Sequence, residues 1–255
     1  WQETSINGQR IDLAALQQAW EEPLQEIFPT AGSHIPTDDL RVDESCLTKT
    51  LHAPYRKENP QVFIPIFPGT NCEYDMTRAF TREGAQVVTE VYRDVASYAR
   101  QIEQADILAI PGGFSVGDEP DGSAKFIVSV LRQAQVKEAV HSLLRKGGLI
   151  LGICNGFQAL IKSGLLPYGQ IRDLDADSPT LAQNDSEHHV AKIVRTQVAS
   201  VASPWLSSFD VGEVHHIPIS HGEGRIVMGS ADYDKYLAAG QIATKYIGEN
   251  PNGSS

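Results

Sequence analysis

The sequence predicts an α/β fold built on a mostly parallel sheet with helices on both faces. Short, continuous apolar runs of strand length recur through the middle of the chain, and amphipathic helical patterns separate them. Several of these runs end in a turn that contains glycine. Parallel strands buried on both faces have such unbroken apolar runs, because helices cover both sides of the sheet.

The elements alternate along residues 62–162 and then become less regular. An apolar run of strand length predicts a strand, whereas a longer amphipathic stretch predicts a helix. The predicted strands are 62–67, 86–92, 106–111, 149–153, 190–201, 217–221 and 241–247, and the predicted helices are 75–83, 97–104 and 123–146, with a break near Gln135.

The first sixty residues differ from the rest. Residues 12–27 carry apolar side chains at helical spacing, so we expect one amphipathic helix, kinked or split at Pro23. Residues 28–60 are rich in Pro, Asp, Thr and Ser and show no period, which favours an extended connector or wrapping arm. We therefore expect a helix and connector over residues 1–60 and one domain over residues 61–255.

Composition excludes several classes of function. A net charge of −11 and no basic stripe argue against nucleic acid as a partner. No apolar run approaches the roughly 20 residues that span a bilayer, so no membrane segment is expected. The three cysteines, Cys46, Cys72 and Cys154, are too few and too scattered for a disulfide framework or a zinc site. We expect a reducing, cytoplasmic compartment and no metal.

Cys154 carries the strongest chemical pattern in the chain. It stands in Gly152-Ile153-Cys154-Asn155-Gly156, a G-x-C-x-G motif between a buried strand and a helical stretch that contains Gln158. Two glycines permit the sharp strand-to-helix turn that exposes a nucleophile. The helix N-terminus would favour a thiolate and an oxyanion. Most free cysteines are small buried hydrophobes, but the flanking glycines favour a nucleophile here.

A second glycine motif follows the neighbouring strand. Pro111-Gly112-Gly113-Phe114-Ser115 could supply backbone N–H donors for the oxyanion of a tetrahedral intermediate, together with the region of Asn155. An ordinary turn would explain the same residues. The motif gains weight because acyl transfer needs both parts close to one reacting atom.

A cysteine nucleophile also needs a base, normally a histidine oriented by a carboxylate. His221 and Glu223 stand at a strand end with glycines between and after them. They are candidates for base and orienter, although a polar turn with a local ion pair explains them equally. The pairs at 188–189 and 215–216 fit surface positions, because adjacent strand residues point to opposite faces. Cys72 fits a structural or pocket-lining role.

These motifs resemble a known family. Residues 152–158 are similar to the nucleophile motif of class I glutamine amidotransferases, whose fold is flavodoxin-like. Together with the motifs at 67–72, 111–115 and 220–225, they resemble the glutaminase domains of phosphoribosylformylglycinamidine synthases over residues 61–246. Residues 19–30 resemble the connector that precedes this domain when it is the C-terminal part of a long single-chain enzyme.

The resemblance implies a reaction and a partner. Cys154 would attack the side-chain amide of L-glutamine, and ammonia would pass to a synthetase domain or subunit that uses formylglycinamide ribonucleotide and ATP. The glutaminase itself would need no cofactor; ATP and Mg would belong to the synthetase. The implied glutamine and oxyanion site comprises Gly112, Gly113, Phe114, Ser115, Asn155 and Gln158.

One departure from the family matters. Its triad His and Glu usually stand in a second H-x-E motif near the end of the domain, and this chain ends at Ser255 without one. We therefore expect a domain shortened at its C-terminus, with His221 as pocket-lining or a substitute base. The alternatives are an amidotransferase of another pathway, or a catalytically incomplete docking module of a synthetase.

Overall fold

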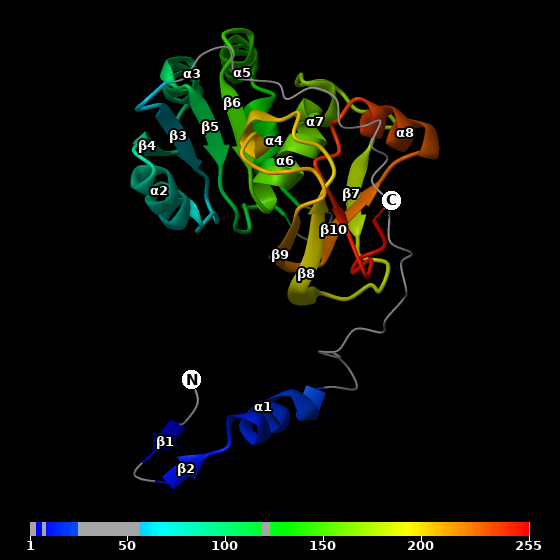
Figure 1. Ribbon diagram of the computed structural model, residues 1–255. Helices are drawn as coiled ribbons and strands as arrows, with labels where there is room; N and C mark the ends of the chain where they lie inside the picture. The colour runs from blue at the N-terminus through cyan, green and yellow to red at the C-terminus, as the bar shows by residue number, and fades with distance from the viewer. Residues whose placement is uncertain (1–3, 7–8, 25–56, 119–122, 255) are drawn as a thin grey trace.

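Four parallel strands form the central sheet. The computed structural model describes residues 4–6, 9–24, 57–118 and 123–254 (Figure 1). The strand order is β4-β3-β5-β6, so the predicted parallel α/β sheet is confirmed. The strands are β3 (Gln61–Ile66), β4 (Gln86–Val91), β5 (Ile107–Ile110) and β6 (Leu149–Gly152).

Helices connect these strands as the sequence predicted. The expected helical stretch at 123–146 divides into two helices at Arg132 and Gln133, slightly before the predicted break. The helices are α2 (Glu73–Arg82), α3 (Val95–Gln104), α4 (Lys125–Leu131), α5 (Ala134–Arg145) and α6 (Asn155–Ser163).

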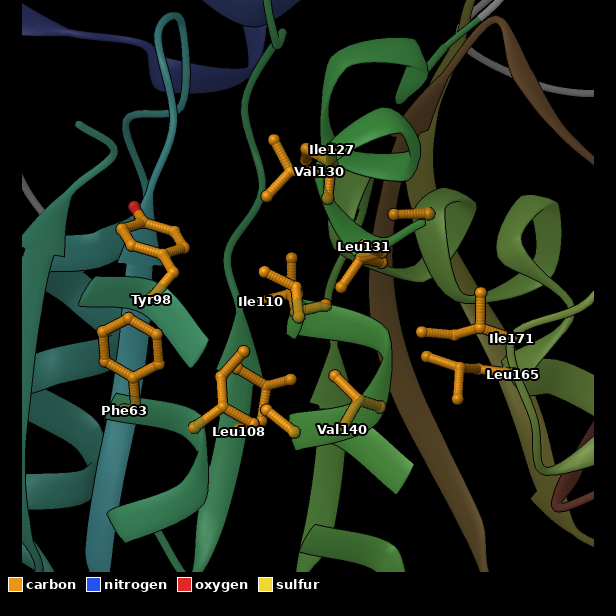
Figure 2. Close-up of a cluster of buried hydrophobic side chains, with 14 of the residues drawn as sticks. Phe63, Tyr98, Leu108, Ile110, Ile127, Val130, Leu131, Val140, Leu165 and Ile171 are labelled. Atoms are coloured by element: carbon orange, nitrogen blue, oxygen red, sulfur yellow. The ribbon is translucent and has the colours of Figure 1, made fainter. Parts of the chain in front are cut away.

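Both faces of the sheet are buried. Successive strand residues point to opposite sides, so neighbouring residues belong to different faces. On one face, Phe63 and Leu108 pack against residues of α3, α4, α5 and α6 (Figure 2). On the other face, Val62 and Ile107 pack with Met76 of α2. This double burial explains the unbroken apolar runs in the sequence.

The C-terminal part is antiparallel. Its sheets have the orders β11-β8-β9 and β10-β7. The structure begins β9 earlier than predicted, makes β11 shorter, and adds β7, β10 and α8, which the sequence did not predict. The elements are α7 (Leu165–Tyr168), β7 (Thr180–Gln183), β8 (Val190–Val198), η3 (Pro204–Leu206), β9 (Val214–His221), β10 (Glu223–Val227), α8 (Ser230–Ala238) and β11 (Thr244–Tyr246).

The predicted N-terminal helix is present and changes form at Pro23. Asp12 caps α1 (Leu13–Glu21), its carboxylate accepting hydrogen bonds from the next turn, and the chain continues as the short 3₁₀ turn η1 (Glu22–Leu24). The hairpin of β1 (Thr4–Ile6) and β2 (Gln9–Ile11) was not predicted. Most of the expected connector, residues 25–56, lies outside the described residues. Across the described ranges, none of the helices is both long enough and apolar enough to cross a bilayer.

Candidate active site

Cys154 sits at the turn between β6 and α6. Its backbone has φ 53° and ψ −113°, a conformation that is strained for any residue with a side chain. Its side chain is exposed. The predicted strand-to-helix turn is therefore present, and the interpretation of Cys154 as a buried hydrophobe does not hold.

Two glycines make this turn possible by allowing backbone to touch backbone. A Cβ on Gly156 would lie 2.2 Å from the carbonyl oxygen of Ile110, at the end of β5. A Cβ on Gly152 would lie 2.7 Å from the carbonyl of Gly156. The first turn of α6 is thus in close backbone contact with the carboxyl ends of β5 and β6, next to Cys154.

The Pro-Gly-Gly turn after β5 lies beside Cys154. A Cβ on Gly112 would come within 3.1 Å of the Cβ of Cys154. Gly113 has φ 122°, and a Cβ there would lie 2.8 Å from the Cα of Thr70, in the loop after β3. The structure therefore brings the predicted nucleophile, Cys154, close to the glycine turn that was predicted to present backbone donors.

Cys72 lines the same place. A Cβ on Gly112 would also lie 3.4 Å from the Sγ of Cys72, so the two cysteines flank this glycine. Burial raises the pKa of the Cys72 thiol, and the charges of Cys154, Asp75 and Glu73 raise it further. Cys72 is therefore held as a protonated thiol, in keeping with a pocket-lining role.

The side chains of Ser115 and Asn155 point into the protein. The Ser115 hydroxyl donates to Oδ1 of Asp118 at 2.8 Å, and the Asn155 amide donates to Oδ2 of the same carboxylate. All three residues are buried. Only the backbone of Ser115 and Asn155 is thus left to face a substrate, whereas Phe114 is 77% exposed.

Asp118 bonds two of the predicted site residues, and the sequence analysis did not single it out. Its one local signal was a carboxylate three residues after Ser115 in a glycine-containing loop, a spacing common in turns. Its burial, and its contact with Asn155 37 positions away, depend on the tertiary fold.

His221 and Glu223 are not brought together as a pair. Nδ1 of His221 lies 3.0 Å from Oδ1 of Asn184. The Glu223 carboxylate forms an ion pair with Lys162 and accepts a hydrogen bond from Ser123 at 2.7 Å. Glu223 also accepts a hydrogen bond through its carbonyl, from the predicted site residue Gln158 at 2.7 Å.

The surroundings of His221 favour its neutral form. Burial, together with the neighbouring His189, lowers the pKa of His221 below its ordinary value, so the imidazole is neutral at neutral pH. In the part of the chain that the structure describes, no three His, Cys, Asp or Glu side chains are grouped to hold a metal ion.

Comparison with known proteins defines the class. The CobB/CobQ-like glutamine amidotransferase domain matches residues 59–255. That range is most of the chain and includes both the Cys154 turn and the Pro-Gly-Gly turn. The chain belongs to this family of glutamine amidotransferases.

Individual relatives are more specific. The chain is 36% identical over 194 residues to the phosphoribosylformylglycinamidine synthase subunit PurQ of Nostoc sp., covering 75% of this chain and 76% of that protein. It is 35% identical over 189 residues to the same subunit of Wolinella succinogenes, covering 74% and 77%. Among solved structures, PurLQS from Thermotoga maritima superposes with a TM-score of 0.59 at 27% identity, covering 77% and 78% of the two chains.

Replacing Gly156 by Ala tests the backbone contact below Cys154. The new methyl would meet the Ile110 carbonyl, and such overpacking costs about 1–3 kcal/mol. We expect a lower midpoint of urea unfolding. Gly229→Ala is the matched control, because nothing lies within 4 Å of its added Cβ. Equal midpoints for both variants would contradict the contact.

The two thiols should differ in reactivity. With iodoacetamide at neutral pH, we expect Cys154 to be alkylated first, since Cys72 is half-buried and its pKa is raised. Alkylation of Cys72 should need a higher pH in the folded protein than in urea. Its profile should move toward lower pH in Cys154→Ser, which removes one source of repulsion. Peptide mapping by mass spectrometry measures both sites, and equal profiles in folded and unfolded protein would refute the assignment.

Proposed function

We propose that this chain is the glutaminase of phosphoribosylformylglycinamidine synthase and supplies ammonia for a step of de novo purine biosynthesis. One observation carries the proposal. An exposed, backbone-strained Cys154 lies beside a Pro-Gly-Gly turn. The chain that holds it aligns with about three quarters of the length of the PurQ subunits compared above.

The proposed chemistry is acyl transfer through a thioester. A base takes the thiol proton while the Cys154 sulfur attacks the side-chain amide carbon of L-glutamine. The C–N bond then breaks, and the base returns that proton to the nitrogen, which leaves as ammonia. Water then attacks the thioester, releasing glutamate and restoring the thiol. Covalent catalysis of this kind divides one difficult step into two easier ones.

Backbone N–H groups stabilise the oxyanion in both steps. Gly113 and Asn155 are the residues we assign to this role, because one lies in the turn beside Cys154 and the other begins α6. The first N–H groups of a helix have no intrahelical partner, and donors fixed before reaction stabilise the developing charge effectively.

The product must be kept from water, which requires a partner on the exposed rim of the site. Ammonia released to water would be protonated and lost as a nucleophile. Phe114, Val116 and Ile153 are apolar and exposed next to the Pro-Gly-Gly turn and Cys154, as a surface covered by another protein would be. We propose that a synthetase covers it and there uses ATP, Mg and formylglycinamide ribonucleotide.

The N-terminal residues fit a linking role in the same assembly. Leu16 and Trp20 of α1 are 53% and 85% exposed, although their spacing forms an apolar stripe. We propose that residues 1–60 act as a helix and connector to the synthetase. The reaction would take place in the cytoplasm, where free thiols such as Cys72 and Cys154 stay reduced.

One observation favours a second candidate, a docking module that does not turn over glutamine by itself. His221 and Glu223 each have a different partner, so this pair lacks the base–orienter hydrogen bond of a triad. Intact mass after incubation with 6-diazo-5-oxo-L-norleucine separates the candidates. An adduct at Cys154 with glutamine hydrolysis supports the glutaminase, whereas an adduct without hydrolysis supports the docking module.

Replacing Cys154 by Ala is the direct test of the proposed function. With the synthetase present, glutamine-dependent amidine formation should fall by on the order of a thousandfold or more, because the nucleophile is gone. Amidine formation from added ammonium salts should stay at the wild-type rate, which controls for the integrity of the synthetase. Survival of glutamine-dependent synthesis would contradict the proposal.

A charge on the rim should uncouple the two activities. In Val116→Asp, a desolvated carboxylate would oppose the synthetase surface, and we expect docking to weaken by roughly tenfold, about 1.4 kcal/mol. More glutamine should be hydrolysed per amidine formed. Ile193→Asp is the matched control, since Ile193 is also exposed but lies on β8. An unchanged ratio in Val116→Asp would place the synthetase elsewhere.

A further inference from the structure

A buried carboxylate joins the two halves of the candidate site. Asp118 is 7% exposed, and its two oxygens accept from two side chains that are more deeply buried, Ser115 at 2% and Asn155 at 1%. The Ser115 hydroxyl bonds Oδ1 at 2.8 Å, and the Asn155 amide bonds Oδ2. The Asp118 backbone N–H also donates a hydrogen bond to the Ser115 carbonyl at 3.2 Å.

The two donors come from the two segments that meet beside Cys154. Ser115 follows the Pro-Gly-Gly turn by two residues, and Asn155 is the residue directly after Cys154. The carboxylate therefore ties the loop after β5 to the first turn of α6, alongside a longer direct hydrogen bond of 3.3 Å from the Ser115 hydroxyl to Oδ1 of Asn155. No backbone–backbone hydrogen bond among the described residues links that loop, residues 112–118, to the first turn of α6.

Such a tie matters for the reaction because oxyanion donors act only when they are held in place. Catalytic groups must stay within about 0.5 Å of the productive geometry, and loss of one donor lowers kcat by roughly 10²–10³-fold. A buried carboxylate is costly unless it is hydrogen-bonded. Here its hydrogen bonds go to the two segments whose separation sets the spacing of the Gly113 and Asn155 N–H groups.

We propose that Asp118 is a positioning residue for acyl transfer, holding the Gly113 and Asn155 backbone donors at a fixed distance around the oxyanion. This inference rests on the proposed glutaminase function. Asp118 does not touch the substrate, and it acts through Ser115 and Asn155. Its role is to fix geometry rather than to exchange protons.

The test compares Asp118→Ala with Asp118→Asn in the full chain with its synthetase. Asp118→Ala removes both hydrogen bonds, and we expect kcat for glutamine-dependent synthesis to fall by about tenfold or more, with KM for glutamine nearly unchanged. Asp118→Asn should recover kcat to within about threefold of wild type. The amide oxygen of the new Asn side chain can accept from Ser115. Its NH₂ can donate to the Asn155 oxygen once the Asn155 side-chain amide rotates by about 180°.

Alkylation of Cys154 by iodoacetamide distinguishes misplaced oxyanion donors from a collapsed turn. Alkylation needs an accessible thiol but no oxyanion donors, so its rate should stay at the wild-type value in Asp118→Ala. A loss of kcat with an equal loss of alkylation would mean that the turn has collapsed, and would overturn the proposal. Unchanged kcat in Asp118→Ala would overturn it as well.

Two further variants keep the outcome decisive. Asp175→Ala is the matched control, because Asp175 accepts from Ser178 three residues away at 2.8 Å, in a loop after α7; its kcat should equal that of wild type. Should Asp118→Ala fail to fold, Ser115→Ala decides instead. It removes the hydrogen bonds from Ser115 to Asp118 and to Asn155 but keeps the one between Asn155 and Asp118. It should lower kcat by a smaller factor, and a wild-type kcat would reject the proposal. Cys154→Ala in the same assay shows separately whether the proposed function itself fails.

Discussion

The site depends on one close contact, in which the backbone of Gly156 lies against the carbonyl of Ile110. No side chain fits between them, so the helix that follows Cys154 can approach the sheet more closely than a packed side chain would allow. That approach places the N-terminus of α6 at the carboxyl end of β5. The Pro-Gly-Gly turn begins at this end of β5, so Gly112 lies directly beside Cys154.

Polar contacts hold the surrounding segments to this helix. Asp118 binds the loop after β5 to the start of α6, while Lys162, near the end of α6, binds Glu223 of β10. The second contact attaches the antiparallel part of the chain to the parallel part. Glu223 therefore has a structural role in the described fold, which explains why it does not orient His221.

The sequence predicted features that depend on neighbouring residues. It did not predict features that depend on contacts between distant parts of the chain. The parallel strands were predictable because burial on both faces leaves an unbroken apolar run. The strand-to-helix turn at Cys154 was predictable because it needs glycines nearby. In contrast, β10 contains charges and a glycine, and it is a strand only because β7 pairs with it. The two-residue spacing of His221 and Glu223 suggested a pair, yet Gly222 separates two strands of different sheets.

Backbone conformation, more than position at a helix, distinguishes Cys154 from Cys72. Cys72 and Cys154 both cap the N-terminus of a helix that follows a strand of the central sheet. The helix dipole therefore does not by itself select one of them. Cys72, at φ −99°, is half-buried, and its thiol bonds to the Asn71 side chain at 3.4 Å. Cys154, at φ 53°, projects outward. The strain at Cys154 thus exposes one thiol, while burial keeps the other protonated.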